Sequence, residues 1–215
     1  MPLLRSELTG NILRFVIYIF LSILLARVLF SFVVIMSPST HLPVSFRKVV
    51  DTLNVAYLMF VALVPIMYII WMYKLHNDMR AMNDDYPVSA GTALLHLLIP
   101  LFNLYGIAKV HYTLAKNLGK NSLTSHLQKP IVRCLILWYI FHFLTSFITL
   151  SNNTLLYGTE ILLIHDISLL LMHVFILLGY RYMSKGLHAL FDSSKETEQE
   201  QKEEEQDQHA VQISQ

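Results

Sequence analysis

Long apolar stretches constrain this chain more than any other feature. Three of them contain at most one charged residue each: 52–73, 131–150 and 161–179. A fourth stretch, 12–36, is as long and holds Arg14 near its start and Arg27 well inside. Because a bilayer core about 30 Å thick offers backbone groups no hydrogen-bond partner, a helix of about 20 apolar residues is what such a stretch forms. The sequence therefore predicts an all-α integral membrane protein with four transmembrane helices.

The composition agrees with a membrane location. Hydrophobic residues make up 54% of the chain and charged residues 14%, whereas a soluble domain carries roughly 25% charged residues. The formal charge of +1 conceals two unlike parts. Residues 1–191 hold 14 basic and 7 acidic residues, and the other 8 of the 15 acidic residues lie in 192–215. We therefore expect a basic polytopic membrane domain at 1–191 and a separate acidic tail at 192–215.

The tail is polar along almost its whole length. No apolar residue occurs from Asp192 until Ala210, and Glu, Gln and Lys dominate. Such a segment buries too little apolar surface to offset its ordering entropy. We expect a disordered acidic cytoplasmic tail, which docks a basic protein partner, contacts the basic loop 109–129 of the same chain or only keeps the protein soluble.

One segment, 87–111, does not fit the pattern of the four spans. Its apolar centre, 93–102, is ten residues long and contains His96 and Pro100. Apolar stretches of about 10–14 residues are more often re-entrant, interfacial or buried in protein than spanning. We expect a kinked re-entrant or interfacial helical segment here.

The placement of basic residues supports this choice, because Lys and Arg in short loops prefer the cytoplasmic side. With four spans, Arg47 and Lys48 are the only basic loop residues that lie on the outer side. Both termini are then cytoplasmic. The basic residues that fall on the inner side are Arg5, Arg14, Lys74, Arg80, Lys109, Lys116, Lys120, Lys129, Arg181 and Lys185.

The block from the end of the second span to the short apolar segment resembles a known family. An aromatic-basic run is followed by an Asn and an Arg, by Pro-x-x-Ala-Gly and by Pro-x-x-Asn-Leu. The residues of this pattern are Trp71, Tyr73, Lys74, Asn77, Arg80, Pro87, Ala90, Gly91, Pro100, Asn103 and Leu104. The block resembles the small bacterial membrane proteins of domain-of-unknown-function family 4328. The resemblance implies a polytopic protein of the bacterial inner membrane and supplies no activity.

Charged residues follow the second span at a helical spacing. Lys74 and Asp78, and likewise Arg80 and Asp84, are four residues apart. Side chains at this spacing are neighbours on a helix. We expect two ion pairs on a short solvated extension of the second helix, which ends before Pro87.

Polar and helix-breaking residues recur on one predicted helical face within 87–111. His96, Pro100, Asn103 and Gly106 follow one another at intervals of four, three and three residues. Proline frees a carbonyl in a membrane helix, and neighbouring polar groups or water must satisfy it. The alternatives are a gate or ligand-binding bend, as in transporters with discontinuous helices, and a kinked packing element.

Two charged residues inside the predicted spans require a partner, because a charge at a helix centre costs about 2.5–3.5 kcal/mol on insertion scales. Arg27 precedes Met36 by nine residues and Asp166 follows Glu160 by six. At 1.5 Å per residue these positions lie about 14 Å and 9 Å below the same membrane face. We therefore expect an Arg27–Asp166 ion pair, acting as a structural pin or as a proton or ion relay.

Other chemistry is weakly indicated. The single cysteine, Cys134, cannot form an intramolecular disulfide or a multi-cysteine zinc site. His142 and His165 can approach each other across the loop between the third and fourth spans, so they are weak candidates for a bis-histidine haem site. We expect no metal and no cofactor, and the sequence holds no Gly-x-Ser-x-Gly or His-Glu-x-x-His motif.

Basic residues without acidic neighbours follow the short apolar segment. They are Lys109, Lys116, Lys120 and Lys129. At the cytoplasmic leaflet each lysine contributes about 1 kcal/mol of attraction to anionic lipid. We expect contact with anionic lipid here and no binding of nucleic acid.

Together these features favour a non-enzymatic membrane scaffold or interaction protein. The alternative is a small transporter or channel component that uses the Pro100 bend and the Arg27–Asp166 pair. A haem protein that uses His142 and His165 is the third hypothesis.

Overall fold

The computed structural model describes residues 4–36, 43–98, 100–152 and 159–213. This part of the chain is helical and contains no strand, which confirms the predicted all-α class. The helices are α1 (Arg5–Met36), α2 (Val44–Met82), α3 (Ala90–Leu98), α4 (Pro100–Lys120), the short 3₁₀ helix η1 (Ser125–Leu127), α5 (Gln128–Asn152) and α6 (Thr159–Ile213).

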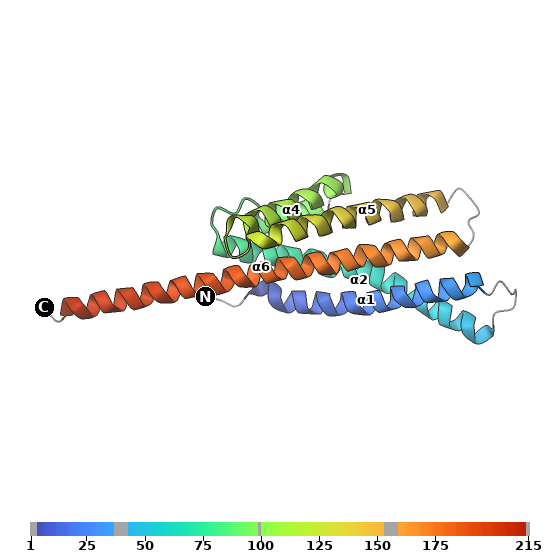
Figure 1. Ribbon diagram of the computed structural model, residues 1–215, viewed down its shortest axis with the longest axis horizontal. Helices are drawn as coiled ribbons and strands as arrows, with labels where there is room; N and C mark the ends of the chain where they lie inside the picture. Colours follow the sequence, from blue (N-terminus) through green and yellow to red (C-terminus); the bar gives the residue numbers. More distant parts are fainter. Residues whose placement is uncertain (1–3, 37–42, 99, 153–158, 214–215) are drawn as a thin grey trace.

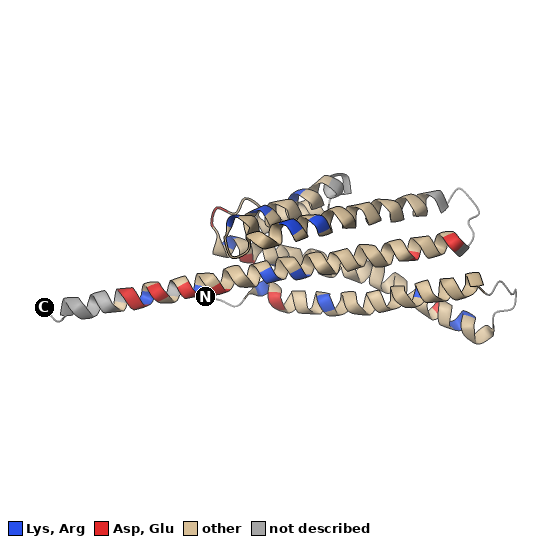
Figure 2. Ribbon diagram, in the orientation of Figure 1, with Lys and Arg blue, Asp and Glu red and all other residues tan. Residues whose placement is uncertain are grey.

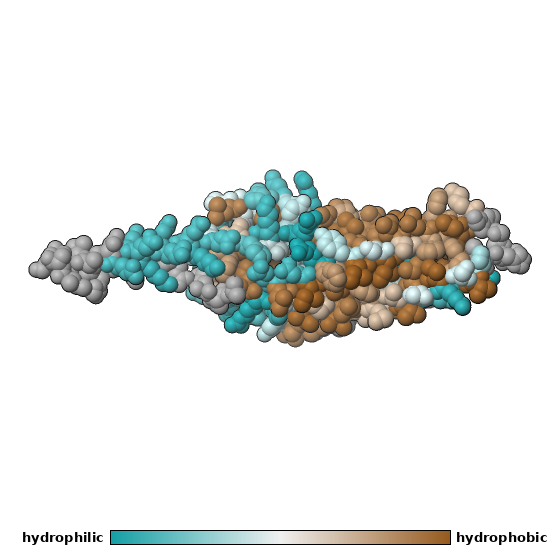
Figure 3. Space-filling view, turned by 90° about the horizontal axis from the view of Figure 1, so that it is seen from below, coloured by the Kyte–Doolittle hydropathy of each residue, from teal (hydrophilic) through white to brown (hydrophobic). Residues whose placement is uncertain are grey.

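Four helices are long and apolar enough to cross a membrane, as the sequence predicts. They are α1, α2, α5 and α6, and each contains one of the predicted apolar stretches. The four helices run along the long axis of the molecule, and the two chain termini lie toward the same end (Figure 1). Apolar side chains cover the surface of the bundle, and polar residues take over where α6 leaves it (Figure 3).

The four long helices pack in the order α2, α1, α6 and α5. Helix α1 lies against both α2 and α6, and α6 lies against both α1 and α5. Among the described residues α2 and α5 do not pack against each other. The bundle is therefore open between α2 and α5, and α3 and α4 lie at this opening, α3 against α2 and α4 against α5.

Helices α3 and α4 form a hairpin. A Cβ atom on Gly106 would lie 2.6 Å from the carbonyl oxygen of His96, so the two helices approach closely where only glycine fits. Because α2 ends and α5 begins at the same end of a four-span bundle, the hairpin enters the bundle and returns to that end (Figure 1). The hairpin is thus packed on the long helices, α3 on α2 and α4 on α5, and its position relative to a membrane stays a prediction.

The hairpin corrects the predicted kink. His96, on α3, and Gly106, on α4, face each other across two helices instead of sharing one helical face. Helix α4 begins at Pro100, a position that proline favours because the first helical residue needs no intrahelical N–H bond. The side chains of Pro100 and Asn103 lie outside the described part of the structure.

The acidic tail is helical in the structure, not disordered as predicted. Helix α6 continues without a break to Ile213 and projects beyond the bundle (Figure 1). Glu, Gln and Lys are good helix formers. Because the membrane span already supplies the helical nucleus, the tail residues only have to extend an existing helix. The composition of the tail alone does not reveal that it continues the helix of the fourth span.

A carboxylate of α2 caps the first turn of α1. The oxygens of Asp78 accept hydrogen bonds from the backbone N–H groups of Arg5, at 3.2 Å, and Ser6, at 2.8 Å. Lys74 donates to the Thr9 hydroxyl at 2.7 Å. The predicted Lys74–Asp78 ion pair is therefore absent from the described contacts, since both side chains turn to α1. Asp78 satisfies free N–H groups and complements the positive end of the helix dipole.

We predict that Asp78→Ala lowers the free energy of unfolding by about 1–2 kcal/mol, because the substitution removes a helix cap. The measurement is the Tm of the purified protein in detergent. Asp84→Ala is the matched control, since Asp84 is exposed and lies six residues further along the chain. Equal Tm changes in the two variants would contradict the capping role.

Candidate functional site

A cavity of about 550 Å³ lies inside the apolar part of the bundle. Its walls come from α2, α5 and α6, and Leu97 and Ile107 of the hairpin close it on one side. The cavity occupies the space that remains because α2 and α5 do not pack together. Its volume falls within the range of small-molecule sites, about 300–1,000 Å³. Most of its lining is apolar, as such sites require.

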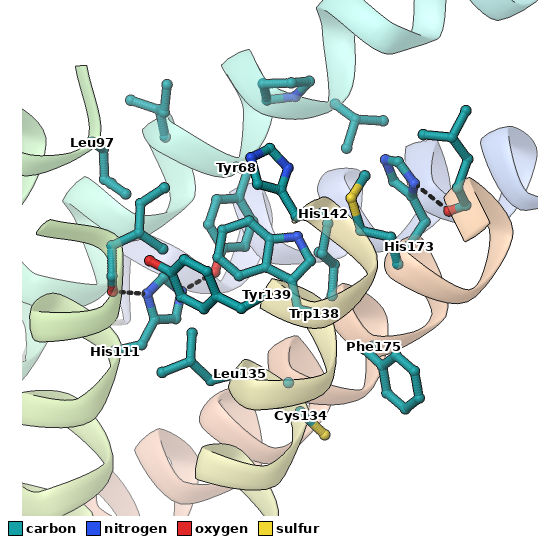
Figure 4. Close-up of a pocket in the computed structure, with 18 of the residues that line it drawn as sticks. Tyr68, Leu97, His111, Cys134, Leu135, Trp138, Tyr139, His142, His173 and Phe175 are labelled. Atoms are coloured by element: carbon teal, nitrogen blue, oxygen red, sulfur yellow. Dashed lines mark hydrogen bonds between the residues drawn. The ribbon is translucent and has the colours of Figure 1, made fainter. Parts of the chain in front are cut away.

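A histidine and a tyrosine form a hydrogen-bonded pair in the cavity wall. His111 Nδ1 lies 2.7 Å from the carbonyl oxygen of Ile107 and therefore carries the ring proton. The other ring nitrogen, Nε2, accepts a hydrogen bond from the Tyr68 hydroxyl (Figure 4).

Trp138 brings an unsatisfied donor to the cavity. Its indole Nε1 is buried and has no hydrogen-bond partner among the described residues. Leaving a buried donor unpaired costs about 1–3 kcal/mol. The ring lines the cavity close to His142, with a distance of 5.8 Å between the ring centroids (Figure 4).

His173 presents an acceptor to the same cavity. Its Nδ1 donates to the carbonyl oxygen of Leu169 at 2.9 Å, so Nε2 is the unprotonated nitrogen. The ring packs edge-on against Phe20, with the centroids 4.6 Å apart, which fixes its orientation. The cavity thus combines an apolar body with an acceptor at His173, and the unpaired indole N–H of Trp138 is buried in its wall.

The structure brings Arg27 and Asp166 together. Arg27 Nη2 lies 3.0 Å from Asp166 Oδ1, and Nη1 donates to the side-chain oxygen of Asn54. The guanidinium also lies over the ring of Tyr57, 4.3 Å from its centroid. The Asp166 side chain is only 3% exposed. This cluster joins α1, α2 and α6, and Tyr57 extends it to the cavity, whose wall Tyr57 forms in part.

Sequence reasoning missed both partners that α2 contributes to this cluster. Asn54 is one of the few residues that interrupt the apolar run 52–73, which was the available signal. Tyr57 follows it by three residues, so both side chains lie on the same face of α2.

The two predicted haem candidates do not share a site. His142 lines the cavity, whereas His165 does not. His165 Nδ1 lies 3.5 Å from Asp166 Oδ1, and its Nε2 lies 3.4 Å from the Thr149 hydroxyl. Within the described ranges no group of three His, Cys, Asp or Glu residues is arranged to hold a metal ion.

The family-pattern residues whose side chains the structure describes do not line the cavity. Trp71 is buried and packs against Tyr180, with the ring centroids 4.8 Å apart, and against Gly10 of α1. Lys74 reaches Thr9. Both residues therefore hold α2 against its neighbours. Of the other described positions, Ala90 is buried, Asn77 is half-buried, and the rest are exposed: Tyr73, Arg80, Pro87 and Gly91.

The four lysines predicted to meet anionic lipid lie on α4 and the first turn of α5. All of them are exposed, and the described contacts include no ion pair for any of them. Lys109 lies over the ring of Tyr105, 5.8 Å from its centroid. They form a solvated basic surface and line neither the cavity nor the ion-pair cluster.

Comparison with known proteins supplies no relative for this chain. No protein-family model, curated protein or solved structure matches it. The cavity and the ion-pair cluster are therefore the features that bear on function.

We predict that Arg27→Asp abolishes accumulation of the protein in membranes and that Arg27→Asp/Asp166→Arg restores it. The single variant places two carboxylates together in a largely buried site, and breaking a buried pair costs about 3–5 kcal/mol. The readout is the amount of protein in isolated membranes by quantitative immunoblot. Arg47→Asp, a reversal of an exposed charge, is the control and should accumulate normally. Equal loss in the single and double variants would rule out the pairing.

Proposed function

We propose that this chain is a non-enzymatic scaffold or interaction protein of a bacterial inner membrane that binds an apolar, membrane-borne molecule. The cavity between α2, α5 and α6 carries this proposal. It holds about 550 Å³ in the apolar part of the bundle, and its wall contains Trp138, whose indole N–H is buried and unpaired among the described residues. A lipid-like molecule with an ester, ether or carbonyl oxygen has the chemistry that matches these walls.

The route to the cavity also favours a ligand from the membrane. Because α2 and α5 do not pack together in the described structure, the part of the gap between them that the hairpin leaves unfilled offers a route from the surrounding lipid chains. A ligand that enters there never crosses water. His111 supports binding over acid-base chemistry, since both of its ring nitrogens already bond to protein groups.

The acidic end of α6 supports a scaffolding role. Eight acidic residues lie between Asp192 and Asp207, opposed only by Lys195 and Lys202. The helix that carries them projects beyond the bundle (Figure 1). A basic protein partner in the cytoplasm is the proposed occupant of this surface.

The distribution of charge supports an orientation with both termini in the cytoplasm. Lys and Arg residues gather at the end of the bundle from which the tail helix projects (Figure 2). The positive-inside rule assigns such an end to the cytoplasm. The resemblance of the block around Trp71 and Pro87 to family 4328 supports the bacterial inner membrane as the location.

A small transporter or channel component is the second candidate. One observation favours it: the hairpin contributes Leu97 and Ile107 to the cavity wall, while the Arg27–Asp166 cluster borders the cavity through Tyr57. Discontinuous helices beside a binding site at membrane depth are a feature of many transporters. Flux of ions into proteoliposomes would favour this candidate over the first.

We predict that wild-type protein purified in mild detergent retains an apolar molecule and that Leu135→Trp loses it. Leu135 lines the cavity, so a larger side chain fills the space that the ligand needs. The measurement is native mass spectrometry, followed by identification of the released molecule.

Ile136→Trp is the matched control. Ile136 neighbours Leu135 on α5 but is 53% exposed on the outside of the bundle. This variant should keep the bound molecule. Equal occupancy in all three proteins, or no bound molecule in any of them, would contradict the proposed function.

A further inference from the structure

A second hollow, between α1 and α6, has the opposite chemistry to the cavity. This groove has a volume of about 500 Å³ and lies on the side of α6 that faces α1. Three cationic side chains line it: Arg14 from α1, and Arg181 and Lys185 from α6. Arg181 and Lys185 are four residues apart, so their side chains lie on one face of α6.

The positive charge of this groove exceeds the negative charge that the protein places in it. In the described ranges Arg14, Arg181 and Lys185 take part in no ion pair or hydrogen bond. The one carboxylate in the lining, Glu7, lies 3.9 Å from His188 Nε2. Three cations gathered in one groove repel one another, and a bound anion would remove that repulsion.

The wall of the groove is rigidly built. Tyr180 lines it and is only 4% exposed. Its hydroxyl lies 2.9 Å from the point where a Cβ on Gly10 would be, so the side chain fits against α1 only because residue 10 is a glycine. This packing holds the hydroxyl beside the cationic groups.

The groove lies at the boundary between apolar and polar surface. Arg14 is the third residue of the apolar stretch 12–36, and Arg181 follows the stretch 161–179 by two residues. Phe15 and Tyr18, next along α1, are exposed on the outside of the bundle. A ligand held here would have its charge at headgroup depth and its chains along α1.

We propose that this groove binds the phosphate of an anionic phospholipid through Arg14, Arg181 and Lys185. Guanidinium groups bind phosphate oxygens through paired hydrogen bonds, which lysine does not reproduce. The site is independent of the cavity and of the proposed function. It also differs from the exposed Lys109–Lys129 surface, whose lysines do not line this groove.

The test measures retention of phosphatidylglycerol and of phosphatidylcholine by the full-length protein in detergent, using native mass spectrometry. Wild-type protein should retain phosphatidylglycerol at least tenfold more strongly than phosphatidylcholine. Arg14→Gln/Arg181→Gln should lose this preference. Both substituted residues are exposed, so the fold should persist, and size-exclusion chromatography checks this.

The control is Lys116→Gln/Lys120→Gln, which removes the same charge from the exposed lysine surface and should keep the preference within twofold. Equal loss in both double variants would overturn the site in favour of general electrostatic attraction. Inorganic phosphate distinguishes the possible sources of the anion. Displacement of the lipid by millimolar phosphate would overturn the lipid assignment, and retention of the lipid supports it. Should the double variant not fold, Lys185→Gln alone must weaken retention of phosphatidylglycerol for the proposal to stand.

Discussion

In a bilayer core a backbone N–H or C=O group has no hydrogen-bond partner except the protein itself, and the architecture follows from this constraint. Four stretches satisfy it by crossing as helices. The short segment at 90–98 cannot cross, so it folds back with α4; α3 lies against α2, and α4 lies against α5. The hairpin thereby occupies the place where α2 and α5 would otherwise meet. The cavity is the part of that place that the hairpin does not fill.

Two polar contacts fix α1 near its opposite ends. Asp78 and Lys74 bind its first turns, and Arg27, nearer its other end, joins it to Asp166. Between them the contacts are apolar, centred on Phe20, which is fully buried. Since breaking a buried ion pair costs about 3–5 kcal/mol, the Arg27–Asp166 pair has a large effect on stability whether or not it takes part in ion transport. The cavity therefore has a fixed wall at α6, on which a ligand can be bound with little reorganisation.

The sequence predicts features that depend on length and depth along one helix. The four spans and the approach of Arg27 to Asp166 are of this kind, because rise per residue alone places them. Features that depend on a neighbouring helix were missed or wrong. The capping role of Asp78 depends on where α1 begins. The contact of Gly106 with α3 depends on a turn between α3 and α4, and the spacing of the polar residues in this segment fits one kinked helix equally well. His173 was one of several histidines until packing placed it in the cavity.

The central claim is that α3 and α4 form a hairpin whose two ends lie on the same side of the membrane, and labelling of those two ends tests it directly. Asp84→Cys and Ser122→Cys, each in a Cys134→Ser background, place one thiol before α3 and one after α4, at exposed positions. Oriented membrane vesicles are treated with a membrane-impermeant maleimide. A re-entrant hairpin predicts that both thiols react from the same side, which is also the side of Gln199→Cys on the tail helix. Reaction of Asp84→Cys and Ser122→Cys from opposite sides would show that this segment crosses the membrane and would contradict the account.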